Sequence, residues 1–215
     1  MENTLQTPDA TFNRGDEPEK RPMLLSDLSD IKTLGGLAAL FAAGSIIPYI
    51  GFLLSLASIV LFLIAFHKIS VFSGKRSIFV NIGISYIIGF VLGIAIVAFI
   101  IIAFLDYFKE LNYNHFDEDY LYYMIQSAKE SAFTTIIAIV VFFLMVTITC
   151  AYLWKLSLDK TAAYFGDNAF KTAGILYIIG ASTMILCGLG ALVNLAAHIV
   201  LAVAFFSLKM PKNPA

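Results

Sequence analysis

Four apolar blocks alternate with polar segments along the chain, at about residues 31–67, 77–105, 132–154 and 170–208. An α-helix needs roughly 20 residues to cross the hydrocarbon core of a bilayer. The second and third blocks have lengths that suit one crossing each. The first and last blocks are close to twice the required length, so each of them predicts two consecutive crossings.

Both long blocks contain a helix-breaking sequence near the middle. Residues 47–51 read IPYIG, and residues 187–190 read CGLG. Proline removes a backbone donor that an uninterrupted helix needs, and glycine permits the backbone angles of a tight turn. The pattern therefore predicts an all-α, polytopic transmembrane bundle of six spans, arranged as three helical hairpins. The expected spans are about residues 30–46, 52–70, 77–105, 132–156, 169–187 and 190–208.

The positions of lysine and arginine distinguish six spans from four. With six spans and a cytoplasmic N-terminus, the cytoplasmic segments hold twelve of these residues and the external segments hold two, Lys109 and Lys129. With four spans the same residues divide nine to five at best. Short cytoplasmic segments of membrane proteins carry an excess of positive charge. The charge pattern therefore favours six spans with both termini in the cytoplasm.

The polar segments define the rest of the organisation. Residues 1–28 are expected to form a disordered cytoplasmic tail, residues 29–208 the transmembrane domain, and residues 209–215 a second cytoplasmic tail. The longest external loop is expected at about residues 107–131, a segment that is acidic and rich in tyrosine. A solvated loop and a cation site are alternative interpretations of its acidic residues 117–119, which also suit the start of a helix.

The composition indicates a lipid environment. Hydrophobic residues make up 60% of the 215 residues, charged residues make up 13%, and the mean hydropathy is +0.85. Soluble domains have about a quarter of their residues charged. The net charge of −1 and the absence of a basic motif argue against a nucleic-acid partner. The two cysteines have no spacing typical of a metal or redox site, and no cofactor is expected.

The first and last hairpins are similar to one another. Residues 31–68 align without a gap on residues 170–207, with 12 identities at a constant offset of 139 residues. The alignment superimposes the two helix breaks and a Lys-Thr sequence at each hairpin entry. Both copies begin on the same side of the membrane, so the sequence predicts a parallel internal repeat. The middle hairpin is then an insertion between the two copies.

Small residues recur at four-residue spacing in two of the expected spans. Gly35, Ala39 and Ala43 lie on one helical face of the first span, and Gly89 and Gly93 form a GxxxG motif in the third. Small side chains let helix backbones approach closely in lipid. These five residues are therefore predicted to pack helices together.

The expected spans contain very few polar groups that could carry chemistry. Asn194 and His198 lie one turn apart in the sixth span, on a face otherwise made of small residues. Ionisable groups inside a bilayer are costly and often mark a functional site. The pair could line a cavity that relays a proton or binds a polar solute, or could form interhelical hydrogen bonds that stabilise packing. Their counterparts in the repeat, Ser55 and Ile59, do not reproduce the pair.

No catalytic motif is present in the sequence. GxSxG, HExxH, GxGxxG and P-loop patterns are absent, and the three histidines are too scattered to form a metal site. Trp154 suits an interfacial anchor, and Asp167 or Asn168 suits the N-cap of the fifth span. We therefore expect no enzyme activity, no catalytic residue and no bound metal.

Four segments of the chain carry a family resemblance. They are the IPYIG break, the SIFVN entry to the third span, WKLSLDKTAAYFG after the fourth, and FKTAGILYIIGA in the fifth. Together they resemble the DUF996 family of small prokaryotic, largely archaeal, integral membrane proteins of unknown function. The resemblance covers about residues 28–208 and implies a multi-pass protein of the plasma membrane. It implies no activity and no functional residues.

Two functions remain open from the sequence. The lack of buried charge, the small-residue faces and the polar tail favour a non-catalytic membrane scaffold or interaction protein. Such a protein would act through membrane lipids, a homo-oligomer or a membrane-protein partner. The duplicated hairpin and the face with Asn194 and His198 favour a small transporter or channel for a proton, an ion or a small solute.

Overall fold

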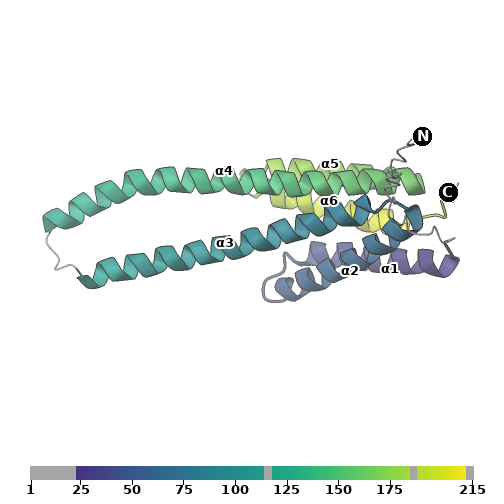
Figure 1. Cartoon of the computed structure of the whole chain (residues 1–215), viewed down its shortest axis with the longest axis horizontal. Helices are drawn as coiled ribbons and strands as arrows, with labels where there is room; N and C mark the ends of the chain where they lie inside the picture. The colour runs from purple at the N-terminus through teal and green to yellow at the C-terminus, as the bar shows by residue number, and fades with distance from the viewer. Residues whose placement is uncertain (1–22, 114–117, 185–187, 212–215) are drawn as a thin grey trace, which may run out of the picture.

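The computed structural model describes residues 23–113, 118–184 and 188–211. Helices account for nearly all of this part of the chain, and no strand occurs in it. Neighbouring helices are antiparallel, so α1 begins and α6 ends at the same end of the bundle (Figure 1). The helices are α1 (Leu25–Gly44), α2 (Gly51–Ser73), α3 (Ser77–Tyr113), α4 (Glu118–Phe165), α5 (Ala169–Ser182) and α6 (Leu189–Phe206).

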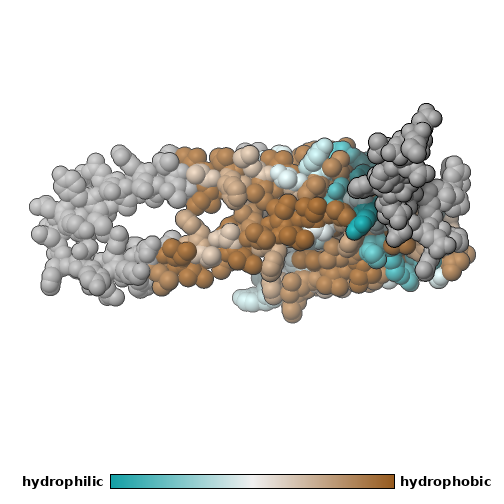
Figure 2. All heavy atoms as spheres, viewed as in Figure 1, coloured by the Kyte–Doolittle hydropathy of each residue, from teal (hydrophilic) through white to brown (hydrophobic). Residues whose placement is uncertain are grey.

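The surface of the bundle is apolar, as expected of a protein embedded in lipid. Large hydrophobic side chains such as Phe52, Phe90 and Val203 are exposed, and Figure 2 shows a broad apolar band over the middle of the molecule. α2, residues 77–99 of α3, residues 137–165 of α4, and α6 are each long and apolar enough to cross a bilayer. The predicted polytopic helical membrane bundle is confirmed.

The two remaining helices are more polar or shorter. α1 has 20 residues, but Asp27, Asp30 and Lys32 lie near its start, and α5 has 14 residues. Each of them forms one arm of a hairpin whose other arm is long and apolar enough to span. Six helices are therefore present where six spans were predicted. Full crossing of the bilayer by α1 and α5 stays a prediction.

The six helices form a closed ring. Each helix packs against the helices before and after it in the sequence, and α6 packs against α1. The middle hairpin of α3 and α4 lies between α2 and α5, which is the place predicted for a hairpin inserted between two copies of a repeat. α3 and α4 also run well beyond the other four helices (Figure 1).

Aromatic side chains fill the ring toward the end at which α1 begins. Trp154 of α4 makes edge-to-face contacts with Phe62 and Phe66 of α2, with ring centroids 5.1 and 5.8 Å apart. Phe205 of α6 lies 5.7 Å from Phe66 and 5.2 Å from Phe170 of α5. We call these five residues the aromatic cluster. Aromatic partners from α2, α3 and α5 surround the ring of Trp154, so it packs within the bundle; its place at the membrane interface stays a prediction.

A tight turn closes the first hairpin, and in the last hairpin α5 ends at Ser182 and α6 begins at Leu189, with residues 185–187 outside the described chain, so the helix is interrupted at both predicted breaks. In each turn one residue has a left-handed backbone. A glycine follows two residues later. A Cβ atom at this glycine would collide with the backbone of the residue six positions before it. The same features recur at an offset of 139 residues, in the pairs Tyr49 and Gly188 (φ 68° and 86°), Gly51 and Gly190, and Ser45 and Met184.

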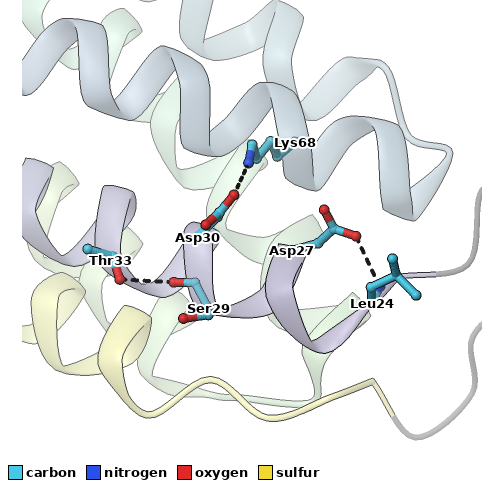
Figure 3. Close-up of polar contacts among 6 residues, drawn as sticks. All are labelled: Leu24, Asp27, Ser29, Asp30, Thr33 and Lys68. Atoms are coloured by element: carbon cyan, nitrogen blue, oxygen red, sulfur yellow. Dashed lines mark hydrogen bonds and ion pairs between the residues drawn. The ribbon is translucent and has the colours of Figure 1, made fainter.

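Polar contacts join the helices at the opposite end of each of these hairpins. Nζ of Lys68 in α2 lies 2.6 Å from Oδ2 of Asp30 in α1 (Figure 3). The hydroxyl of Ser207, directly after α6, donates to Oδ2 of Asp167 at 3.2 Å. Oδ1 of Asp167 accepts the backbone N–H of Ala169 at 2.9 Å, and Asn168 is the N-cap residue of α5, one of the two predicted, although its side chain makes no capping hydrogen bond. Lys68 and Ser207 are again 139 residues apart, but Asp30 and Asp167 are 137 apart, so the two contacts lie at similar places without matching residue by residue, and the internal repeat stays a prediction.

The segment predicted as a long external loop is mostly helical. Of residues 107–131, α3 includes 107–113 and α4 includes 118–131, and the residues between them lie outside the described chain. Apolarity ends where the hydrocarbon ends, but Glu, Lys, Leu and Met favour a helix in water as well. Hydropathy therefore underestimated how far α3 and α4 extend beyond their apolar segments. The start of α4 at Glu118 agrees with the interpretation of the acidic residues as a helix start.

Two other boundaries change for the same reason. α1 begins at Leu25, so the last residues of the expected tail 1–28 are helical, while residues 1–22 lie outside the described chain. α4 continues to Phe165 instead of ending near residue 156. Asp159 is consequently a helical residue that pairs with Lys155 at 2.5 Å, one turn earlier.

Candidate functional site

A cavity of about 320 Å³ lies inside the ring, between the aromatic cluster and the turns of the first and last hairpins. Its wall contains hydroxyl, amide, imidazole and aromatic groups, and the described lining residues include no Asp, Glu, Lys or Arg. Small-molecule sites typically have volumes of about 300–1,000 Å³. We call this hollow the central cavity. All six helices contribute to it, in order through Ala42, Ser55, Tyr86, Thr147, Tyr177 and His198.

Asn194 and His198 lie together in the wall of the central cavity, as their spacing predicted. Nδ1 of His198 lies 2.7 Å from the backbone carbonyl oxygen of Asn194. A carbonyl oxygen only accepts hydrogen bonds, so the proton of a neutral imidazole is on Nδ1 and the lone pair is on Nε2. This bond lies within α6, so it orients the ring and does not join two helices. His198 thus offers the cavity an acceptor in a fixed orientation.

The side chain of Asn194 also packs against a neighbouring helix. Its amide lies against the backbone of Gly180 in α5, in space that any larger residue at Gly180 would occupy. The sequence left a packing role and a cavity-lining role as alternatives. The structure combines them at Asn194, which contacts α5 and lines the central cavity.

Tyr177 is a site residue that the sequence analysis did not select. Its side chain is 9% exposed, and its hydroxyl has no hydrogen-bond partner among the described residues. An unsatisfied polar group in a protein interior costs about 1–3 kcal/mol. In a cavity wall such a group indicates a place for a ligand or an ordered water molecule. The repeat contained a signal, because the counterpart of Tyr177 is Ala38, and a tyrosine occurs in one copy only.

The central cavity lies between the two copies of the predicted repeat. Ser55 and Ile59, the counterparts of Asn194 and His198, line it from α2. Among the described lining residues, amide and imidazole groups therefore come from α6, whereas Ser45, Ser55 and Ser58 supply hydroxyls on the side of α1 and α2. A ligand held by the amide and imidazole groups would be bound asymmetrically.

A second hollow, of about 260 Å³, lies between α3 and α4. We call it the α3–α4 cleft. It adjoins the central cavity, because Tyr86, Thr147, Cys150 and Trp154 line both hollows. The rest of its wall is largely apolar and includes Gly89, Leu92, Gly93, Ile96, Phe143 and Val146.

The residues predicted to pack helices fall into two groups. Gly35 and Ala39 are buried, Ala43 is half-buried, and the ring of Phe205 fills the space beside Gly35. In contrast, nothing in the described chain lies within 4 Å of the position that a side chain at Gly89 or Gly93 would occupy. These two glycines line the α3–α4 cleft instead of a helix contact.

No group of three or more potential metal ligands occurs within residues 23–113, 118–184 and 188–211. His67 packs edge-on against Phe79, with ring centroids 5.1 Å apart. His115, Asp117 and Cys187 lie outside the described residues. The described structure thus leaves hydrogen bonding in the central cavity as the chemistry that can be assigned.

Comparison with known proteins assigns the chain to a family. No solved structure matches it. An uncharacterised protein of Methanocaldococcus jannaschii, MJ1644, is 29% identical over 188 residues, which are 86% of this chain and 96% of that protein. The profile of a family described as "Protein of unknown function (DUF996)" matches residues 54–199, a range that contains Tyr177, Asn194 and His198. The chain therefore belongs to the DUF996 family of proteins of unknown function.

Proposed function

We propose that this chain is a small membrane transporter whose substrate-binding site is the central cavity. The observation that carries the proposal is the unpartnered hydroxyl of Tyr177 in a cavity that all six helices line. A binding site in the middle of a helical bundle, formed at the interface of two repeats, is a common arrangement in secondary transporters.

The central cavity favours the transporter over the scaffold that the sequence also suggested. A scaffold requires stable packing and an external contact surface. An interior hollow with an unsatisfied hydroxyl lowers stability, since buried polar groups are normally paired and cores are normally filled. Binding of a solute would satisfy the hydroxyl of Tyr177 and fill the hollow. The arrangement is thus better explained by a ligand than by packing alone.

The cavity has one closed side. Phe62 and Trp154 line the cavity, and Phe66 and Phe205 lie directly beyond them within the aromatic cluster. On the other side the cavity reaches Ser45, next to the turn of the first hairpin. We propose that passage requires the aromatic cluster to separate, with the two hairpins of the repeat moving relative to one another.

The proposed location is the plasma membrane, with both ends of the chain in the cytoplasm. Support comes from the positive charge at the closed end of the bundle, where Figure 2 shows polar side chains beside the apolar band. Lys109 and Lys129 belong to the far ends of α3 and α4. The other cationic residues of the described chain belong to the closed end: Lys32, Lys68, Lys75, Arg76, Lys155, Lys160, Lys171 and Lys209.

The proposed substrate group is uncharged and forms hydrogen bonds. The described wall has no Asp, Glu, Lys or Arg side chain to balance a charge, and a bare charge in such a site would be strongly disfavoured. Nε2 of His198 accepts a hydrogen bond, and the hydroxyl of Tyr177 can donate one. These groups bind a solute and carry out no covalent step, so we propose transport without catalysis. The surrounding lipids are its immediate partners.

Solute flux in reconstituted liposomes tests this proposal. Swelling after an osmotic shock with glycerol or urea is compared with proton flux reported by an enclosed pH-sensitive dye. We expect His198→Phe, which fills the cavity, to abolish the flux that the protein adds to empty liposomes. Ile199→Phe is the matched control, because Ile199 is the next residue and is 49% exposed on the outside of the bundle. Flux equal to that of empty liposomes for every probe, or equal flux in His198→Phe, would contradict the proposal.

A further inference from the structure

We infer that the molecule bound by this protein is a single-chain amphiphile. Its polar group would lie in the central cavity at Tyr177 and His198, and its hydrocarbon chain would lie in the α3–α4 cleft. This inference rests on the proposed function and specifies the class of its substrate.

Three hollows adjoin one another from the interior of the ring to the surrounding lipid. The central cavity and the α3–α4 cleft share Trp154 and Tyr86 in their walls. The cleft in turn shares Gly89 and Gly93 with a groove of about 620 Å³ on the exposed side of α3. A chain lying in the cleft can therefore reach the bilayer without passing through the aromatic cluster.

Hydrogen-bonding capacity falls along this path. The hydroxyl of Ser85 donates to the carbonyl of Ile82 at 2.7 Å, and that of Thr147 donates to the carbonyl of Phe143 at 2.8 Å. The hydroxyls of Ser85 and Thr147 are thus satisfied within their own helices. Tyr177, whose hydroxyl has no partner in the described chain, lines the central cavity. One end of the path suits a polar group and the other suits hydrocarbon.

The size of the cleft fits a chain and excludes a helix. From Ser85 to Ile96 the cleft follows α3 for about 16 Å, at 1.5 Å per helical residue. A volume of about 260 Å³ over that length leaves a narrow slot, whereas a helix with its side chains is about 10–12 Å across. A second copy of this protein therefore cannot insert a helix into the cleft. A hydrocarbon chain can, and both helices beside the cleft are apolar enough to lie within the bilayer.

The glycines of α3 explain how the cleft stays open. Side chains at Gly89 and Gly93 would project into empty space among the described residues. Larger residues there would occupy the volume assigned to the chain without disturbing the helix contacts of the ring. Substitution of these glycines should consequently block binding of the hydrocarbon chain without affecting the folding of the protein.

Fluorescence of Trp154 provides a direct test, because it is the only tryptophan in the chain and lines both hollows. The protein is reconstituted in phosphatidylcholine and titrated with a monoacylglycerol whose chain carries bromine, which quenches tryptophan on contact. We expect saturable quenching that unbrominated monoacylglycerol reverses. Gly89→Leu and Gly93→Leu should each lose the saturable part. Gly83→Leu, on another face of α3 and also in open space, should retain it.

The outcomes separate the inference from the function on which it rests. Equal quenching in all variants would rule out a single-chain amphiphile as the ligand. Quenching by brominated phosphatidylcholine that monoacylglycerol does not displace would also rule it out, and would indicate ordinary annular lipid around the protein. If glycerol or urea flux persists and depends on His198 in that case, the transporter survives and only its substrate class is wrong. If His198→Phe leaves the saturable quenching unchanged, the placement of the polar group is wrong. The fluorescence of each variant without ligand shows whether the ring has folded.

Discussion

The ring of His198 packs edge-on against the ring of Tyr177, with centroids 5.1 Å apart and an interplanar angle of 87°. The two residues come from neighbouring helices, α6 and α5, and both line the central cavity. One offers an acceptor nitrogen and the other an unpartnered hydroxyl. A single group that both donates and accepts, such as a hydroxyl or an amide, could satisfy both. This pair is therefore the most specific constraint on what the protein binds.

Removal of the Tyr177 hydroxyl separates binding from stability. Because this hydroxyl has no partner in the described structure, Tyr177→Phe should leave the free energy of unfolding unchanged or raise it by up to about 1–3 kcal/mol. The same change should weaken ligand binding. Thermal unfolding in detergent and the fluorescence response of Trp154 measure the two effects.

Tyr164→Phe is the matched control for that substitution. The hydroxyl of Tyr164 donates to the carbonyl oxygen of Phe72 at 3.1 Å, outside the central cavity. Its removal should destabilise the protein by about 1 kcal/mol and leave binding intact. If Tyr177→Phe behaved like Tyr164→Phe, the hydroxyl of Tyr177 would have a structural partner and no role in the site.

The helices could be predicted from the sequence because each signal was local. Apolar block length and the breaks at 47–51 and 187–190 predicted the first and last hairpins. The ends of α3 and α4 were missed, because a helix that leaves the bilayer keeps its helical propensity while losing its apolarity. The interior position of Trp154 was missed because it depends on aromatic partners up to 92 residues away in the sequence, such as Phe62.

The candidate site could be predicted only in part. Asn194 and His198 were found because polar residues are rare in apolar helices, so each one is conspicuous. Tyr177 was not found, because a tyrosine in a span resembles an ordinary core or interfacial residue. Its significance depends on the absence of a partner for its hydroxyl, which is a property of the packed helices. Similarly, the GxxxG motif of α3 does not reveal that Gly89 faces a cleft.

Gly35 should tolerate no side chain. The ring of Phe205, which is fully buried, occupies the space that the Cβ of Gly35→Ala would need. Overpacking of this kind destabilises by about 1–3 kcal/mol. Gly83→Ala is the control, because the Cβ atom at this position would enter open space. This variant should be more stable by up to about 1 kcal/mol, since alanine has the higher helix propensity. Unfolding temperatures that fall equally for both variants would show that α1 and α6 do not pack as described.

The ion pair of Lys68 and Asp30 should contribute modestly and depend on salt. Its side chains are 30% and 58% exposed, and pairs of that kind contribute about 1 kcal/mol or less. Lys68→Gln should therefore lower the unfolding temperature slightly at low ionic strength and less at high ionic strength. Ser207→Ala removes the similarly placed contact to Asp167, in which one partner is neutral, and its effect should vary less with salt. A loss at Lys68 that salt does not change would rule out an electrostatic contribution.

Cysteine labelling can determine how many helices cross the membrane and which way the chain faces. Single cysteines replace Tyr49 and Gly166 in a protein whose two native cysteines, Cys150 and Cys187, are changed to serine. Tyr49 lies in the turn between α1 and α2 and is fully exposed, and Gly166 follows α4 at the cation-rich end. With six spans, a membrane-impermeant maleimide added to intact cells should label position 49 and leave position 166 unlabelled until the cells are opened. If the α1–α2 hairpin does not cross the bilayer, position 49 will react from the same side as position 166, because the turn is then on the cytoplasmic surface.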